Sequence, residues 1–181
     1  MFKPDEPRHS FEIKNSNDFF NKLLQEYSDF DKQHLNPRHA INCAITSWHL
    51  TDWTYHEFYS RHADFQDSEK VDKKGCVKKI SGLLKYQQYV TKKCPELEFM
   101  RLIANGSKHC LINDKSRTEK TSIKGGGFST AFSRHALNVP RFEIQKNNSE
   151  KIDFEKTLIS TIQFWQLLIE EEEEENKTKE D

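Results

Sequence analysis

Apolar residues recur at three- and four-residue spacing along much of the chain, which is the pattern of amphipathic helices. The first such stretch follows a candidate N-cap at Ser16 and contains Phe19, Phe20, Leu23, Leu24, Tyr27 and Phe30. The second follows Asn36 and Pro37, a cap and first-turn pair, and extends over residues 38 to 62 without a breaker. The pattern predicts two helices here, the second being the most buried of the fold.

Two further helices are predicted before residue 110. A seam of apolar residues predicts a helix over residues 68 to 93, formed by Val77, Ile80, Leu83, Leu84 and Val90. Gly75 and Gly82 weaken its first half, because glycine in a helix costs about 1 kcal/mol relative to alanine. A fourth helix is predicted from Pro95, where Leu97, Met100, Leu102 and Ile103 lead towards His109.

The pattern changes in the last third of the chain. Residues 110 to 139 include a Gly125-Gly126-Gly127 run and keep no period, so they predict an irregular connection. Alternating residues on both sides of Asn147-Asn148-Ser149 predict a β-hairpin over residues 140 to 154. A final helix follows, with Leu158, Ile159, Ile162, Trp165, Leu168 and Ile169, and leads into an acidic tail at residues 170 to 181.

These elements predict a mainly α protein, a bundle of four or five helices with a small β-hairpin before the last helix. Helices joined by short links form bundles because each apolar stripe must be covered by another. The low content of glycine and proline and an aromatic content of 12% agree with one helical domain over residues 1 to 169. The chain has no run of 18 apolar residues and no apolar signal segment at its start, so we expect a cytoplasmic protein without a membrane partner.

Charge and motifs exclude several functions. Outside residues 170 to 181 the chain holds 26 basic and 21 acidic residues, a mild excess that suits a phosphate-bearing partner but not a nucleic-acid coat. The four cysteines show no C-x-x-C spacing, so we expect reduced thiols and no structural zinc. The triple glycine lacks the P-loop framework, and neither G-x-S-x-G nor H-E-x-x-H occurs.

The most distinctive polar group lies on the fourth predicted helix. Arg101, Asn105 and His109 fall at positions i, i+4 and i+8, with Lys108 beside them. An arginine stabilises charge on phosphoryl oxygens, and a histidine titrates near neutrality and can move a proton. RNA supplies its own nucleophile, the 2′-hydroxyl, so no metal or cofactor is needed. The alternative is that the helix ends at Asn105-Gly106, with Arg101 and Lys108 facing solvent.

Three stretches of the chain carry a resemblance to a known superfamily. They are AINCAITSWHLTDW at 40–53, CPEL at 94–97 and ANGSKH at 104–109. Together they resemble a group of uncharacterised prokaryotic HEPN-like proteins over about residues 38 to 110. The resemblance implies a HEPN-like helical bundle. In ribonuclease members of the superfamily, two protomers join an Arg-x(4 to 6)-His motif from each in a shared cleft and cleave RNA without a metal.

Carried onto this chain, the resemblance makes Arg101 the motif arginine and His109 the motif histidine. In the hypothesis built on it, Asn105 is a third catalytic group. Lys108 and Ser107 would bind the substrate phosphate. The implied function is a metal-independent endoribonuclease of the toxin or phage-defence type. Its implied partners are RNA, a second copy of the chain, and a neutralising antitoxin or regulatory protein.

The spacing of this motif leaves a second function open. Seven residues separate Arg101 from His109, one more than the motif allows. On a regular helix this turns His109 by about 80° from Arg101. A kink at Gly106 would restore the geometry, although Gly106 also suits a close approach of helices. Without a kink, the chain would be a non-catalytic HEPN-like module for RNA binding or dimerisation.

A second polar stripe lies on the helix predicted over residues 38 to 62. His49, Asp52 and His56 follow one another at i+3 and i+4 spacing. With a ligand from another helix they could hold a metal in the bundle. Alternatively, His49 and Asp52 line the cleft of Arg101 and His109 and contact the substrate. The third alternative is a solvent-facing or dimer-forming surface.

Overall fold

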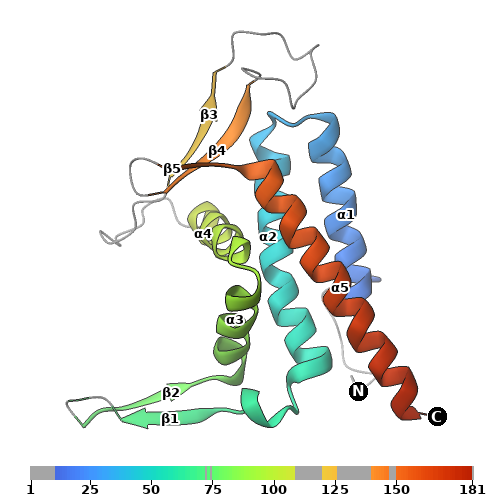
Figure 1. Ribbon diagram of the computed structural model, residues 1–181, viewed down its shortest axis with the longest axis vertical. Helices are drawn as coiled ribbons and strands as arrows, with labels where there is room; N and C mark the ends of the chain where they lie inside the picture. Colours follow the sequence, from blue (N-terminus) through green and yellow to red (C-terminus); the bar gives the residue numbers. More distant parts are fainter. Residues whose placement is uncertain are drawn as a thin grey trace.

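A computed structural model describes residues 11–71, 73, 75–108, 120–125, 140–146 and 150–180 of the chain. The structure is mainly helical, with five α-helices and two small antiparallel sheets among the described residues (Figure 1). The mainly α class is therefore confirmed. None of the described helices is both long enough and apolar enough to cross a membrane.

Helices α1 (Ser16–Lys32) and α2 (Pro37–Thr54) pack side by side and are joined by a short turn. Asn36 caps α2 as predicted, because its side-chain oxygen accepts a hydrogen bond from the Arg38 backbone amide at 3.1 Å. The cap of α1 was predicted one residue too late. It is Asn15, whose side-chain oxygen accepts a hydrogen bond from the Asp18 amide at 2.7 Å, whereas Ser16 is the first helical residue and is buried.

Replacing Asn15 with alanine is expected to lower the free energy of unfolding by about 1 kcal/mol, because the first turn of α1 loses its cap. Ser16→Ala is the matched control. The Ser16 hydroxyl is buried without a hydrogen-bond partner among the described residues, so its removal should cost little. Chemical denaturation of both variants gives the comparison. A larger loss for Ser16→Ala than for Asn15→Ala would contradict the assignment of the cap.

The helix predicted over residues 38 to 62 is regular only to Thr54. It then widens into a π-helical turn, Tyr55–Tyr59, and a 3-10 turn follows at Ala63–Phe65. Helix α2 contacts α1, α3, α4 and α5, and is thus the central helix of the fold, as its composition predicted.

The prediction of a helix over residues 68 to 93 is wrong in its first half. Strands β1 (Ser68–Val71) and β2 (Val77–Ile80) form an antiparallel hairpin, and α3 begins only at Gly82 (Gly82–Lys93). Gly75 has a φ of +81°, a left-handed conformation that favours glycine and serves the turn. Val77 was assigned to a buried helical seam, but its side chain is 59% exposed.

Helix α4 (Glu96–Lys108) packs against α2 and continues through Asn105 and Gly106. The alternative in which the helix ends at Asn105-Gly106 is therefore wrong, and Gly106 is itself part of the helix. Helices α3 and α4 lie on one side of α2, and α1 and α5 lie on the other (Figure 1).

The β-hairpin predicted before the last helix is confirmed as β4 (Arg141–Lys146) and β5 (Glu150–Asp153). A third strand, β3 (Lys120–Lys124), pairs with β4 and gives the sheet order β3-β4-β5. Residues 120–124 were expected to be irregular, and that expectation is wrong. The strand has a single apolar residue, Ile123, which is exposed, so its sequence carries little strand signal.

Helix α5 (Phe154–Glu180) runs into the glutamates, as predicted, and continues through the segment that was expected to be an acidic tail. The Tyr59 hydroxyl donates a hydrogen bond to Glu172, and Asn17 Nδ2 donates one to Glu173 Oε1 at 3.2 Å. The acidic run therefore begins as a helix packed on α1 and the π-helical turn.

Aromatic rings fill much of the core. Trp165 of α5 is fully buried, and its indole Nε1 donates a hydrogen bond to the Ser47 carbonyl of α2 at 3.0 Å. At one end of the bundle, Phe30 contacts the rings of Phe142 and Phe154 at centroid distances of 6.4 and 5.5 Å. These contacts join α5 and the β3-β4-β5 sheet to the α1-α2 pair.

Candidate nucleic-acid interface

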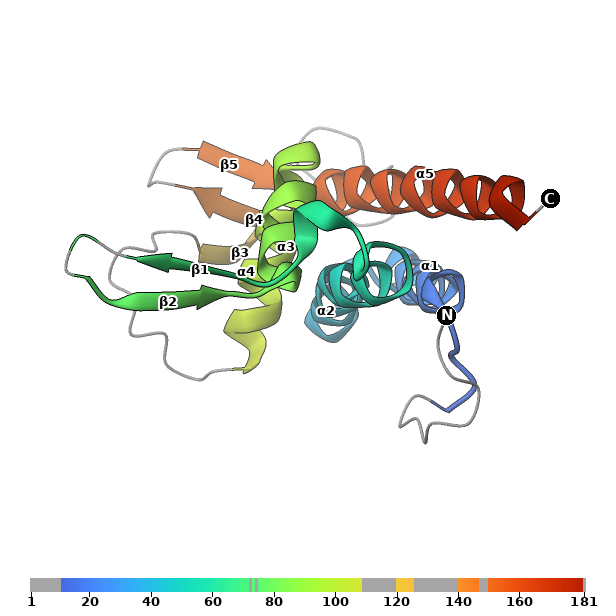
Figure 2. The ribbon, with the colours of Figure 1, turned by 90° about the horizontal axis from the view of Figure 1, so that it is seen from below.

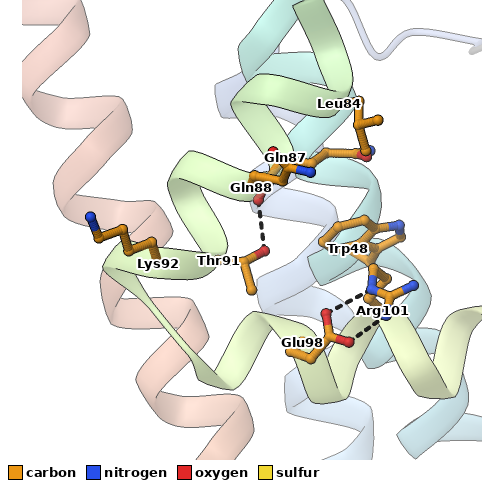
Figure 3. A pocket seen from close by; sticks show the side chains of 8 residues that line it. All are labelled: Trp48, Leu84, Gln87, Gln88, Thr91, Lys92, Glu98 and Arg101. Atoms are coloured by element: carbon orange, nitrogen blue, oxygen red, sulfur yellow. Dashed lines mark hydrogen bonds and ion pairs between the residues drawn. The ribbon is translucent and has the colours of Figure 1, made fainter. Parts of the chain in front are cut away.

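Arg101 lies in a hollow of about 470 Å³ between α3 and α4, which we call the α3–α4 groove (Figure 3). The side chain of Arg101 is 26% exposed. Helix α2 contributes Trp48, α4 contributes Glu98 and Arg101, and the rest of the lining comes from α3, namely Leu84, Gln87, Gln88, Thr91 and Lys92. Arg101 is thus reachable from solvent and surrounded mainly by polar side chains.

The Arg101 guanidinium is held in place by Glu98, one turn earlier on α4. Arg101 Nε donates a hydrogen bond to Glu98 Oε2 at 2.7 Å, and Nη2 donates to Oε1 of the same carboxylate. These hydrogen bonds raise the pKa of Arg101 above its ordinary value. A guanidinium has five N–H donors, so the pair leaves three of them for a ligand in the groove.

Hydrogen bonds along α3 and α2 fix the polar wall of the groove. Gln87 Nε2 donates to Thr51 Oγ1 at 3.3 Å, and Thr51 Oγ1 donates to the Trp48 carbonyl at 2.8 Å. Thr91 Oγ1 donates to the Gln87 carbonyl at 2.7 Å. These bonds hold the Gln87 side chain between α3 and α2, at the floor of the groove.

A second hollow of about 300 Å³ adjoins the α3–α4 groove. It is lined by Trp48, His49, Thr51, Asp52, Trp53 and Gln87, and we call it the α2 hollow. The two hollows share Trp48 and Gln87. His49 and Asp52 therefore line a hollow next to that of Arg101, and their predicted contact with the substrate stays a prediction.

His49 and Asp52 differ in their surroundings. Partial burial lowers the pKa of His49 below 6.5, and the nearby Asp52 carboxylate opposes this effect only in part. Asp52 Oδ1 lies 3.6 Å from His56 Nε2 on the next turn of α2. The lowered pKa favours the neutral imidazole of His49, in which one ring nitrogen donates a hydrogen bond and the other accepts one.

The His49 environment predicts a pH effect on stability. Because the pKa of His49 is lower in the folded than in the unfolded chain, the unfolded chain binds this proton more readily as the pH falls below 6.5. The histidine thus costs stability at acidic pH and costs none at alkaline pH. His49→Gln should reduce the loss of unfolding free energy between these pH values, measured by chemical denaturation. An unchanged pH dependence would contradict this environment.

The other predicted residues of α4 divide between two faces of the helix. Asn105 and Lys108 lie four and seven residues after Arg101, within about 40° of it around the helix axis, so they share its face. Ser107 instead lines a separate hollow of about 350 Å³ with Gly106, Leu102 and Ile103, and its hydroxyl donates to the Ala104 carbonyl at 2.9 Å. The structure does not bring Ser107 to Arg101, and its predicted contact with the substrate is not supported.

His109 lies outside the described residues, so its pairing with Arg101 stays a prediction. A metal site at His49, Asp52 and His56 lacks support. Within the described part of the chain, no three histidine, cysteine or acidic side chains come together in a way that could hold a metal ion. Burial raises the pKa of both Cys43 and Cys94 to about 12, which keeps these thiols protonated.

Sequence reasoning missed the α3 side of the groove. Gln87, Gln88 and Thr91 were not among the residues singled out from the sequence. One signal was present: an uncharged polar cluster, Gln-Gln followed by Thr, lies beside the apolar residues of α3. Polar side chains next to a buried face are usually hydrogen-bonded, as Gln87 is to Thr51.

Comparison of this chain with protein-family models, curated proteins and solved structures finds no match.

Proposed function

We propose that this protein binds single-stranded RNA in the α3–α4 groove, on a helical bundle of HEPN-like type. The observation that carries the proposal is the Arg101 guanidinium, held by Glu98 with its remaining donors available to a groove ligand. Arginine forks of this kind match the geometry of phosphate oxygens.

The shape and lining of the site suit an unpaired nucleotide better than a duplex. The groove and the α2 hollow are concave and of nucleotide size, about 470 and 300 Å³, whereas an RNA duplex offers broad grooves and a regular backbone. Lys92 and Lys108 supply further positive charge for the backbone. Gln87 and Gln88 supply amides for base edges or a 2′-hydroxyl, and the half-buried Trp53 offers an apolar wall in the α2 hollow.

Titration of labelled single-stranded RNA into the purified protein tests this function. We expect saturable binding that weakens as salt rises, because bound lysine and arginine release counterions from the RNA. A duplex RNA of the same sequence serves as the control and should bind more weakly. Absence of saturable binding to single-stranded RNA at low salt would refute the proposal.

A second candidate function is a metal-independent endoribonuclease of the toxin or phage-defence type, formed by a homodimer. The exposed donors of Arg101 and the position of Asn105 on the same face of α4 favour it. His109 would act as base on the 2′-hydroxyl or as acid on the leaving oxygen, and Arg101 would stabilise the phosphorane. The Glu98 carboxylate favours RNA binding over RNA cleavage as the function, because it occupies two donors of Arg101 that a phosphorane would need.

Incubation of RNA with the protein in EDTA separates the two functions. Cleavage that persists in EDTA and falls at least about a hundredfold in His109→Ala would establish the nuclease, since general acid–base catalysis contributes about 100- to 10,000-fold. Binding without cleavage would leave the RNA-binding function alone. An antitoxin or regulatory protein is a further expected partner only if cleavage is found.

A further inference from the structure

We infer that the β1–β2 hairpin, through its strands Ser68–Val71 and Val77–Ile80, is a second contact for the RNA backbone, and we call these two strands the basic arm. This inference rests on the proposed RNA-binding function and adds a site to it. The two strands contain three lysines and one glutamate, so they carry a net positive charge. In both views the arm projects from the helical body, on the side away from α1 and α5 (Figure 2).

The root of the arm is fixed by hydrogen bonds between the segments on its two sides. The Gly82 amide donates to Asp67 Oδ1 at 2.8 Å, and Lys85 Nζ donates to the Gln66 carbonyl at 2.7 Å. The Tyr55 hydroxyl donates to the Phe65 carbonyl at 3.3 Å. The arm is therefore held in a defined direction at its base.

The residues of β1 and β2 are almost all exposed, which is unusual for a hairpin of two short strands. Two-stranded hairpins are marginally stable in water without packing against other elements. In addition, Lys70 and Lys78 are direct partners in the strand register, so two lysines occupy the same position along the arm. A nucleic-acid backbone that lies along the arm would contact both lysines, so the net positive charge favours it as the partner.

The arm leads directly into α3, which forms one wall of the groove. Strand β2 ends at Ile80, Ser81 caps α3, and Leu84 already lines the α3–α4 groove. A strand of RNA that leaves the groove at the Leu84 end would therefore meet the base of the arm. A short oligonucleotide would fill the groove alone, whereas a longer one would also reach Lys70 and Lys78.

This difference in length provides the experiment. Binding of a tetranucleotide and of a long single-stranded RNA is measured over a range of salt for the wild type and for Lys70→Gln/Lys78→Gln. The control, Lys156→Gln/Lys177→Gln, removes the same charge from exposed positions of α5. We expect the arm variant to lose several-fold affinity for the long RNA only, and its slope of log affinity against log salt to become about 1.4 shallower. The control should behave as the wild type.

The outcomes separate the arm from the groove. Wild-type protein that binds neither RNA would refute the proposed function itself. An arm variant with the salt slope of the wild type, alongside an Arg101→Gln variant that binds both RNAs weakly, would refute the arm and leave the groove intact. Sedimentation of the arm variant supplies a further check. A change in its oligomeric state would indicate that the arm, with its exposed residues Val71 and Val77, belongs to an interface between protein chains. That result would also overturn the inference.

Discussion

Glutamine in place of Arg101 is expected to weaken binding of single-stranded RNA by about ten- to a hundredfold, because a hydrogen bond between charged groups contributes about 1.5–3 kcal/mol. The effect on folding should be small. The Glu98 side chain is already 39% exposed beside Arg101, so its carboxylate can be solvated once the guanidinium is gone. Anisotropy titrations measure the affinity, and chemical denaturation confirms that the variant is folded.

Glu98→Gln provides the opposite test at the same site. In the wild type, Glu98 occupies two donors of Arg101 and places a negative charge in the groove. Removing that charge should tighten RNA binding, since the guanidinium gains donors and the phosphate loses a repulsive neighbour. If Arg101 only serves to pair with Glu98, Glu98→Gln should instead leave the affinity unchanged.

Arg101→Lys separates charge from geometry. Lysine keeps the positive charge but cannot offer a planar fork to two phosphate oxygens. We expect an affinity between those of the wild type and Arg101→Gln. Equal affinity for Arg101→Gln and the wild type would remove the groove from the RNA-binding site.

The long helices could be predicted because their signals are local. The apolar spacing of α1 and α2, the Asn36-Pro37 pair and the alternation before α5 each act within a few residues. The β1–β2 hairpin could not be predicted in the same way. Val77 and Ile80 continue the apolar spacing of α3, and the left-handed turn at Gly75 outweighs that pattern. Strand β3 forms because β4 offers it an edge, which a sequence window around Ile123 does not contain.

In the candidate site too, the residues of a single helix could be predicted, and those that another helix contributes could not. Arg101, Asn105 and Lys108 share one face because they belong to one helix, so their spacing predicts the arrangement. Gln87 and Thr91 join them only because α3 and α4 pack next to each other on the same side of α2, where Tyr86, Val90 and Leu97 are buried. The pairing of Glu98 with Arg101 follows from i,i+3 spacing and was available in the sequence, but it was not used.

Alanine at Gly82 is expected to lower the free energy of unfolding by about 3 kcal/mol, opposite in sign to the usual effect of this substitution in a helix. A Cβ atom at this position would lie 1.7 Å from the Phe65 carbonyl oxygen and 2.4 Å from the Tyr55 hydroxyl oxygen. The carbonyl is backbone and cannot turn aside as a side chain would. The first turn of α3 must therefore move away from the segment that precedes β1.

This displacement would reach both parts of the proposed RNA site, because Gly82 lies between the basic arm and Leu84 of the groove. We therefore expect Gly82→Ala to weaken RNA binding as well as folding. Gly125→Ala is the matched control: its Cβ would meet nothing within 4 Å, and stability should change by less than about 1 kcal/mol. Denaturation curves that coincide for the two variants would show that α3 does not approach Phe65 as closely as described, and the arm would then lack its fixed root.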